Sequence, residues 1–168
     1  MTSGIEVMIE IPMGSDPVKY EVYTKTGQIY LDRFLDTAMF YPTNYGFIPN
    51  TMSSDGDPID VCVVSPYPLI HGCIARCRVL GMLDMTDQCG HDPKLIAVPM
   101  DRLYADWLDI GDVPTILKNQ IKHFFTHYKD LEIEGWTEVG EWRTSLQARL
   151  YISESEQKEQ NLLTRWSV

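Results

Sequence analysis

Apolar residues recur at strand-like intervals through the first hundred residues of the chain. Residues 18–23 and 28–34 are rich in β-branched and aromatic side chains, and Thr26-Gly27 supplies a turn between them, so this stretch predicts a β-hairpin. Further apolar runs predict strands near residues 61–64, 74–83 and 95–98. Many short strands separated by turn residues are typical of a barrel or a sandwich.

Two later segments have the periodicity of helices. Between residues 113 and 131, apolar side chains recur at spacings of three and four, and Asp112 is a candidate N-cap. A second helix is expected over about residues 142–157, with Leu146 and Leu150 facing inward.

Residues 40–49 are aromatic but interrupted by proline and glycine, so we expect a loop there. The whole pattern predicts one domain over residues 1–168, with a mainly β fold. A small β-barrel formed by about residues 5–100 would carry the two helices on its outside.

The composition narrows the class of protein. The chain has 168 residues, 44% of them hydrophobic, which suits one domain with a substantial core. No apolar run approaches 18 residues, and residues 5–11 alternate charged and apolar side chains, so we expect no membrane span, no signal peptide and a cytoplasmic location. The net charge of −10 disfavours nucleic acid as a partner.

Cysteine and histidine offer little chemistry. Cys62, Cys73, Cys77 and Cys89 form no CxxC pair and are expected to be reduced, structural thiols. A zinc site at Cys89-Gly90-His91 would lack two further ligands at ordinary spacing. His123 and His127 lie four residues apart, but the segment between them lacks the glutamate of a zincin helix.

The most informative segment is Asp55-Gly56-Asp57-Pro58-Ile59-Asp60, which directly precedes an apolar strand. Glycine and proline exclude a solvated helix face, and the strand should hold the carboxylates rigidly. Crowded carboxylates raise one another's pKa unless a positive charge neutralises them. A hard divalent cation, Mg²⁺ or Mn²⁺, is the partner that such oxygen ligands favour.

A second acidic stretch, residues 84–94, links two predicted strands. Either stretch alone could be a solvated turn, because aspartate favours turns. Together they favour a shared site for several metal ions. The spacing does not fit an EF-hand, because no glutamate follows at the twelfth position. It does not fit a haloacid-dehalogenase motif either, because the aspartates precede the strand.

Basic and phenolic residues are scattered among the strands and the first helix. Arginine and lysine suit phosphate oxygens, although each residue taken alone is more often a surface or packing residue. Glu10 and Glu21 lie on otherwise apolar strands and could face the same cavity. The candidates are Lys19, Arg33, Tyr41, Tyr45, Lys94, Tyr128 and Lys129.

Several segments in this order resemble the soluble family I inorganic pyrophosphatases, from about Glu6 to Asp130. The DGDPxD segment, residues 55–60, is highly specific. The others are Ile9-Glu10-Ile11-Pro12, Asp16-Pro17-Val18-Lys19-Tyr20-Glu21, Asp32-Arg33-Phe34, Phe40-Tyr41-Pro42-Thr43-Asn44-Tyr45-Gly46 and His127-Tyr128-Lys129-Asp130. The similarity fades after about Gly135.

The resemblance implies a closed five-stranded OB-like barrel, a homohexamer and Mg²⁺-dependent hydrolysis of pyrophosphate to two phosphates. Asp57 would be the base acting on the attacking water. Glu21 and Tyr41 would hold the residues that bind metal or substrate, without binding either themselves. Asp55, Asp60 and Asp92 would hold the first Mg²⁺, Asp60 also a second, Asp87 with Asp92 a third, and Glu10 a further one. Lys19, Arg33, Tyr45, Lys94, Tyr128 and Lys129 would hold the phosphoryl groups.

The chemistry agrees with this reading. Two metal ions lower the pKa of a bridging water, and further cations neutralise the phosphoryl charge, so no covalent intermediate is expected. Position 88 is glutamine, whereas many bacterial members of the family carry glutamate there. The alternatives are an acidic scaffold without catalysis, an OB-type nucleic-acid binder and a phosphohydrolase acting on nucleoside triphosphates or polyphosphate.

Overall fold

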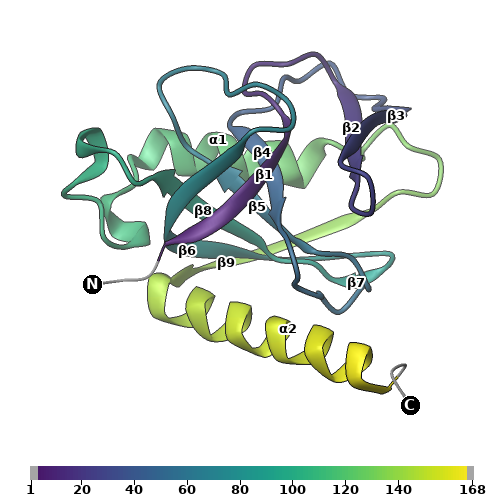
Figure 1. Cartoon of the computed structure of the whole chain (residues 1–168). Coiled ribbons are helices and arrows are strands. Elements are labelled where there is room, and N and C mark those ends of the chain that lie inside the picture. Colours follow the sequence, from purple (N-terminus) through teal and green to yellow (C-terminus); the bar gives the residue numbers. More distant parts are fainter. Residues whose placement is uncertain (1–3, 166–168) are drawn as a thin grey trace.

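Strands dominate the computed structural model, which describes residues 4–165 (Figure 1). The helices are α1 (Thr115–His127) and α2 (Ser145–Arg165), with two short 3-10 helices, η1 (Arg102–Tyr104) and η2 (Ile110–Asp112). The strands are β1 (Ile5–Ile11), β2 (Val18–Tyr23), β3 (Gln28–Phe34), β4 (Asn44–Ile48), β5 (Ile59–Val63), β6 (Ile74–Asp87), β7 (Gly90–His91), β8 (Lys94–Pro99) and β9 (Thr137–Thr144). Among the described residues, no helix is both long and apolar enough to cross a membrane.

Five strands form a closed ring of hydrogen-bonded pairs in the order β1–β4–β5–β8–β6, and β6 returns to β1. Four of the five pairings are antiparallel, and β5 pairs with β8 in parallel. The core strands are buried on both sides; every residue of β4 is buried. The prediction of a mainly β fold with a small five-stranded barrel and two helices is confirmed.

The hairpin β2–β3 lies outside this ring as a separate two-stranded sheet. Every residue of β3 is exposed, including Phe34. Lys19 lies opposite Arg33 in the antiparallel register, so the hairpin brings two basic residues together as neighbours on adjacent strands. The hairpin predicted from the sequence is therefore present, but it contributes little to the core.

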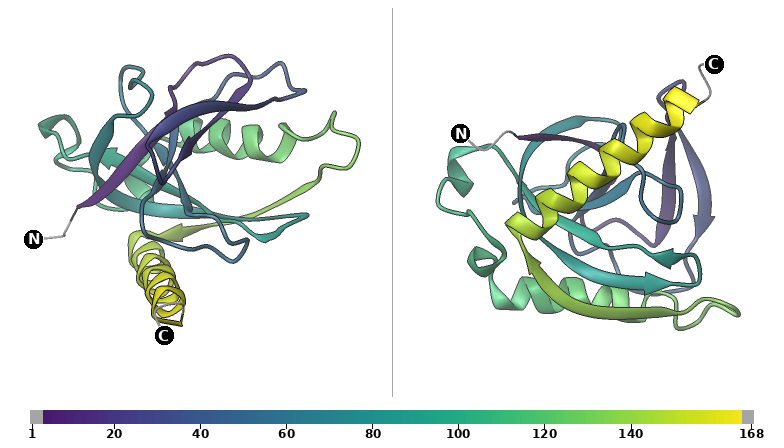
Figure 2. Two further views of the ribbon diagram at one scale, coloured as in Figure 1. Left: turned by 45° about the vertical axis from the view of Figure 1, so that its right-hand side comes forward. Right: turned by 90° about the horizontal axis from the view of Figure 1, so that it is seen from below.

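The two helices cover different parts of the ring. α1 packs beside β9 and buries Ile121, Phe124 and Phe125 in the larger core cluster. α2 lies diagonally across one end of the ring in the view from below (Figure 2) and contacts β6. It buries Ala148 and Ile152 against the second core cluster.

Two expectations about strands were wrong. Residues 44–48, expected within a loop, form β4, because tertiary pairing with both β1 and β5 outweighs the glycine in the segment. Gly46 is needed there, since a Cβ at this position would lie 1.9 Å from the Met8 carbonyl oxygen. β9, which pairs with β6, occupies residues that the sequence assigned to a loop and to the start of the second helix.

Two expectations about helices were also wrong. α2 begins at Ser145, extends to Arg165 and leaves Leu146 and Leu150 65% and 57% exposed. Ala148 and Ile152 face inward instead. Asp112 does not cap α1; its carboxylate accepts hydrogen bonds from the amides of Leu108 and Asp109 and so stabilises η2 instead.

Candidate active site

One cavity of about 580 Å³ collects every residue proposed from the sequence for the site. The ring contributes strand ends and loops, the hairpin β2–β3 contributes three residues, and the segment after α1 contributes two. The structure thus brings together residues as far apart in sequence as Glu10 and Lys129. The set comprises Glu10, Lys19, Glu21, Arg33, Tyr41, Tyr45, Asp55, Asp57, Asp60, Asp87, Asp92, Lys94, Tyr128 and Lys129.

The first acidic segment lies in the loop between β4 and β5. Asp55 accepts a hydrogen bond from the Asp57 amide at 3.0 Å, which forms a tight turn around Gly56. Gly56 has a φ of +91°, a backbone conformation that favours glycine. Asp57 is exposed at this turn, whereas Asp60 lies on β5. Burial, Asp55 and Asp60 raise the pKa of Asp57 above its ordinary value.

The second acidic segment is a tight hairpin between β6 and β7. Asp87 ends β6 and accepts a hydrogen bond from the Cys89 amide at 2.8 Å. The Asp92 amide donates to the Met85 carbonyl at 2.9 Å. As expected, this segment links two strands, and its turn is shorter than residues 84–94 because β6 extends to Asp87. Asp87 and Asp92 are both buried.

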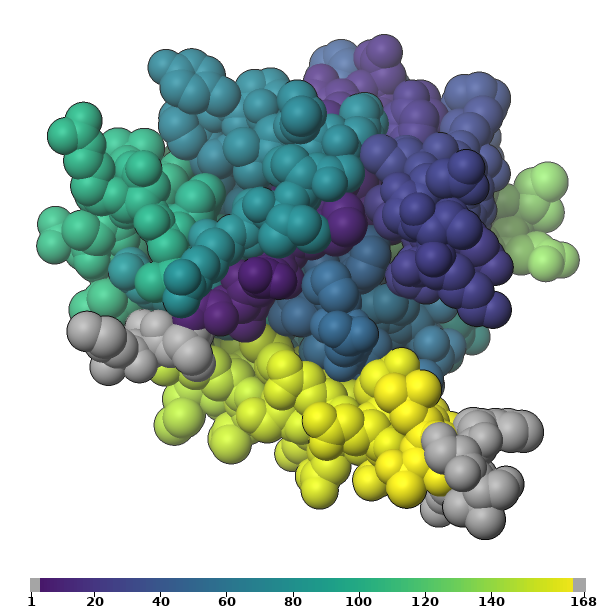
Figure 3. Space-filling view, in the orientation of Figure 1, coloured from purple at the N-terminus to yellow at the C-terminus, as the bar shows by residue number. Residues whose placement is uncertain are grey.

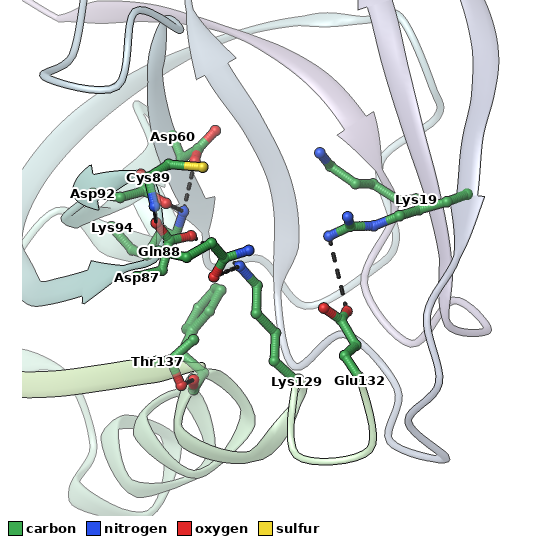
Figure 4. A network of polar contacts seen from close by, with 12 residues as sticks. Lys19, Asp60, Asp87, Gln88, Cys89, Asp92, Lys94, Lys129, Glu132 and Thr137 are labelled. Carbon is green, nitrogen blue, oxygen red and sulfur yellow. Dashed lines mark hydrogen bonds and ion pairs between the residues drawn. The ribbon is translucent and has the colours of Figure 1, made fainter. Parts of the chain in front are cut away.

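Lys94 joins the two acidic segments. It begins β8, whose parallel pairing with β5 places it beside Asp60. Its Nζ lies 2.6 Å from a carboxylate oxygen of Asp60 and 2.6 Å from one of Asp92 (Figure 4). Burial would lower the pKa of Lys94, but these two carboxylates hold it well above its ordinary value, so the ammonium group stays charged.

The carboxylate of Asp92 is nevertheless poorly compensated. Burial is the largest influence on its pKa, and the negative charge of Asp60 acts in the same direction. These effects outweigh the ammonium group of Lys94 and raise the pKa of Asp92 to about 6. One lysine therefore does not fully neutralise this pair of carboxylates.

Lys129 performs the corresponding role for Asp87. Its Nζ lies 2.8 Å from the Asp87 carboxylate and 3.3 Å from the Gln88 side-chain oxygen (Figure 4). Burial would raise the pKa of Asp87, but the Lys129 ammonium and the Cys89 amide hold it below its ordinary value. The two lysines thus lie on the ring side of the cavity, each bonded to buried carboxylates.

The hairpin side carries more exposed charges. Lys19 contacts Glu21 at 2.8 Å and Asp32 at 3.5 Å. Arg33 lies 3.9 Å from Glu132, in the loop after α1. Figure 4 shows Lys19 facing the lysine–carboxylate groups from the opposite side. These side chains have room to turn toward a ligand in the cavity.

Tyr41, Tyr45 and Tyr128 line the cavity together with Phe125 of α1. Tyr41 packs on Phe124 and on Tyr45, with ring centroids 4.8 and 5.6 Å apart. Burial raises the pKa of Tyr41, Tyr45 and Tyr128 well above the ordinary tyrosine value. Their hydroxyl groups therefore stay protonated and are available as hydrogen-bond donors.

Glu10 connects the ring to the hairpin. It lies on β1 and accepts a hydrogen bond from the Val22 amide of β2 at 3.0 Å. Burial, more than the nearby Asp60 and Glu21, raises the pKa of Glu10 to about 8 despite that hydrogen bond. Much of this buried side chain is therefore protonated near neutral pH in the absence of a cation.

The donor set fits hard divalent cations, which prefer carboxylate oxygens. Burial, and after it the neighbouring carboxylates, raise the pKa values of Glu10, Asp57 and Asp92, and a bound cation would oppose both effects. Within residues 4–165, no three histidine, cysteine or carboxylate side chains are grouped closely enough to hold an ion as they stand. In this arrangement, Lys94 and Lys129 bond the carboxylates that an ion would use.

The structure adds residues that the sequence did not suggest. Cys89 lies at the cavity edge because the hairpin turn is tight, and Glu159 reaches the cavity from α2. No motif could have found Glu159, since only the docking of α2 places it there. His91 lies 3.5 Å from Asp84 and does not line the cavity, so the structure shows no zinc site with Cys89.

Comparisons with known proteins show the family to which the chain belongs. The family model for inorganic pyrophosphatase matches residues 7–160. The inorganic pyrophosphatase of Yersinia pestis is 51% identical over 158 residues, which cover 92% of this chain and 90% of that protein. That of Escherichia coli K12 is 49% identical over 164 residues, which cover 96% and 93%. The crystal structure of the Thermus thermophilus inorganic pyrophosphatase superimposes with a TM-score of 0.89 at 41% identity, covering 95% of this chain and 92% of that one.

Proposed function

The chain belongs to the family I inorganic pyrophosphatases of the bacterial type and is an enzyme that hydrolyses inorganic pyrophosphate, and from this premise we propose how its residues carry out the reaction. The reaction is an in-line attack of a metal-activated water on one phosphoryl group, without a covalent intermediate. The observation that carries this proposal is the convergence of five aspartates, three glutamates, three lysines and an arginine on one cavity.

The family depends on divalent metal ions, and the carboxylates would hold them here. Asp55, Asp60 and Asp92 would bind one ion, and Asp60 would also contribute to a second. Asp87 with Asp92, and Glu10 in its own position, would bind further ions, for which Mg²⁺ is the preferred choice and Mn²⁺ a substitute. When bound, such ions lower the pKa of water and neutralise phosphoryl charge.

Asp57 is the general base in this proposal. It lies at the exposed tip of the turn, so its carboxylate is accessible to water, unlike the buried Asp87 and Asp92. Its raised pKa brings it closer to the pH at which a base works well. It orients the attacking water and accepts a proton from it.

The basic and phenolic groups hold the substrate and the departing phosphate. Lys19 and Arg33 on the hairpin, with Lys94 and Lys129 on the opposite side, place four cationic groups around the cavity. Tyr45 and Tyr128 donate hydrogen bonds through their protonated hydroxyls. Glu21 keeps Lys19 in place through their 2.8 Å contact, and Tyr41 supports Tyr45 by packing on its ring.

Assembly and location complete the proposal. Large exposed apolar side chains, among them Phe34, Ile116 and Ile133, support association into a homo-oligomer, of which we favour the hexamer. All four cysteines are unpaired, which supports a reducing compartment such as the cytoplasm. Size measurement in solution tests the assembly directly.

Phosphate release from pyrophosphate tests the mechanism. We expect fast release with Mg²⁺, none with a chelator, and a fall of about 10²- to 10⁴-fold in kcat for Asp57→Asn, the range typical of a lost general base. Asp106→Asn is the matched control, because Asp106 is exposed and does not line the cavity. Product phosphate should acquire one oxygen directly from labelled solvent water. A trapped aspartyl phosphate would overturn the proposal.

A further inference from the structure

The C-terminal helix α2 contacts the loop that carries Asp55 and Asp57. The Tyr151 hydroxyl and the Ser53 hydroxyl share a hydrogen bond of 2.7 Å, across 98 positions of sequence. One turn further along α2, the Ser155 carbonyl accepts a hydrogen bond from the Met52 amide at 3.3 Å. Figure 3 shows α2 packed directly against the neighbouring part of the chain along this side of the molecule.

Ser53 is the residue on which the acidic turn depends. Its amide donates to the Asp57 carbonyl at 2.7 Å, and its carbonyl accepts from the Gly56 amide at 3.2 Å. Ser53 is buried, whereas Gly56 and Asp57 are exposed. A contact that holds the Ser53 side chain therefore also holds the turn on which Asp55 and Asp57 are presented.

Tyr151 contacts the second acidic segment as well. Its ring meets the His91 ring edge-on, with centroids 6.0 Å apart and an angle of 82° between the planes. His91 directly precedes Asp92. One tyrosine thus touches both of the loops that carry the proposed metal ligands.

The face of α2 that carries Tyr151 is directed at the site. Residues four apart share a helix face, and here Tyr151, Ser155 and Glu159 follow that spacing. Ser155 is fully buried and donates its hydroxyl to the Tyr151 carbonyl at 2.9 Å. Glu159 lines the cavity itself. Leu150, on another face, is exposed.

We infer that Tyr151 is a positioning residue for pyrophosphate hydrolysis, acting through Ser53 to hold the loop of Asp55 and Asp57 against the segment of Asp92. This inference rests on the roles proposed above for those aspartates. Loops that carry reactive groups work only when a scaffold fixes them to within a fraction of an ångström. Without the Tyr151 hydroxyl, the loop keeps its own turn bonds but loses the side-chain hydrogen bond that joins it to α2.

The test uses Tyr151→Phe, Ser53→Ala and the double variant, with Tyr67→Phe as the matched control. Tyr67 is exposed, and it loses the same hydroxyl group far from the cavity lining. Mg²⁺ binding is measured by calorimetry without substrate, kcat and KM are measured at saturating Mg²⁺, and the unfolding midpoint is measured for every variant.

We expect Tyr151→Phe to weaken Mg²⁺ binding and to lower kcat by about 3- to 10-fold each, the factor that corresponds to one ordinary hydrogen bond. KM for pyrophosphate should stay unchanged, because the groups that hold the phosphoryls lie mainly on the hairpin and near α1. The unfolding midpoint should shift little. The double variant should be no worse than the more severe single variant, since both lose one shared contact.

Two outcomes would overturn the inference. Tyr151→Phe could bind Mg²⁺ and turn over like Tyr67→Phe, or the effects of Tyr151→Phe and Ser53→Ala could multiply in the double variant. If Asp57→Asn kept its kcat, the proposed role of Asp57 would fail instead. Calorimetry would then still decide whether Tyr151 and Ser53 act together on metal binding.

Discussion

The two sides of the cavity are built differently. On the ring side, Lys94 has a side-chain exposure of 3% and bonds two carboxylates of strands and loops that the core holds in place. On the hairpin side, Lys19 and Arg33 have side-chain exposures of 31% and 46%, on a two-stranded sheet outside the ring. Solvent therefore screens the charges of Lys19 and Arg33 far more than the charge of Lys94.

This difference suggests a division of labour. Buried, paired charges contribute to folding and keep a fixed geometry, as ligands for metal ions must. Exposed charges lose little free energy when they exchange one partner for another. The hairpin can therefore adjust first to pyrophosphate and then to the two separating phosphates. Substitutions on the ring side should therefore alter stability and metal binding as well as substrate use, whereas substitutions on the hairpin should alter substrate use alone.

The largest effect on stability is expected from Lys94→Met. It leaves Asp60 and Asp92 without their shared ammonium group, and removing one partner of a buried ion pair typically costs about 3 to 5 kcal/mol. Denaturant unfolding in the presence of a chelator measures the loss. Mg²⁺ should recover part of it by supplying the missing positive charge. A loss below about 1 kcal/mol would contradict the structural role assigned to Lys94.

Arg33→Ala should have the opposite effect, a loss of substrate use without a loss of stability. We expect kcat/KM for pyrophosphate to fall by about 10- to 100-fold, the loss of one charged hydrogen-bonding group, with an unchanged free energy of unfolding. Lys25→Ala, an exposed basic residue at the turn of the same hairpin, is the control. A large loss of stability with Arg33→Ala would show that the hairpin charges are structural after all.

Glu10→Gln tests the link between the two regions. Because the folded-state pKa of Glu10 is about 8 against an ordinary value of 4.5, the folded protein binds a proton in that window that the unfolded chain has released. Stability of the metal-free protein should therefore rise as pH falls from 8 toward 4.5. Glutamine keeps the acceptor for the Val22 amide, removes this pH dependence and should stabilise the protein at pH 8 by about 1 kcal/mol or more.

The measurement is the difference in unfolding free energy between the two proteins across that pH range, with a chelator present. The difference should shrink at low pH, where Glu10 is protonated in both states. Added Mg²⁺ should stabilise the wild-type protein more than Glu10→Gln at high pH. A difference that is constant with pH would show that Glu10 is not the group that titrates.

Gln88→Glu should have the smallest effect. The Gln88 side-chain oxygen lies 3.3 Å from Lys129 beside Asp87, so a carboxylate there adds one negative charge at the cavity edge. We expect the Mg²⁺ concentration for half-maximal rate to fall by a few-fold, with kcat almost unchanged. An unaltered Mg²⁺ titration curve would remove any role for Gln88 in metal affinity.

Much of the site could be predicted from the sequence because its chemistry is concentrated in short segments. The carboxylates between Asp55 and Asp60 are close in sequence and therefore close in space in any fold that contains that turn. The hairpin of β2 and β3 could likewise be predicted from its β-branched and aromatic residues and its turn. Glu159 and Tyr151 could not, because nothing in their local sequence indicates what α2 packs against.

Local pattern also misled the assignment of some elements. Leu146 and Leu150 are apolar at helical spacing, yet the inward face of α2 carries Ala148, Ile152 and Ser155. Apolar residues lie on more than one face of this helix, and only packing against the sheet selects the face that is buried. Similarly, residues 137–144 form the strand β9 because they pair with the long strand β6.

The class of fold, the acidic turn with its glycine and the residue types of the active site follow from the sequence alone, because turns, periodicity and short motifs are local properties. The bonds of Lys94 to both Asp60 and Asp92, and the hydrogen bond between Tyr151 of α2 and Ser53, form only in the folded chain. The order of strands in a ring and the docking of a terminal helix depend on contacts between segments far apart in the chain. Their energies are shared over many packed residues, and no single segment of sequence contains them.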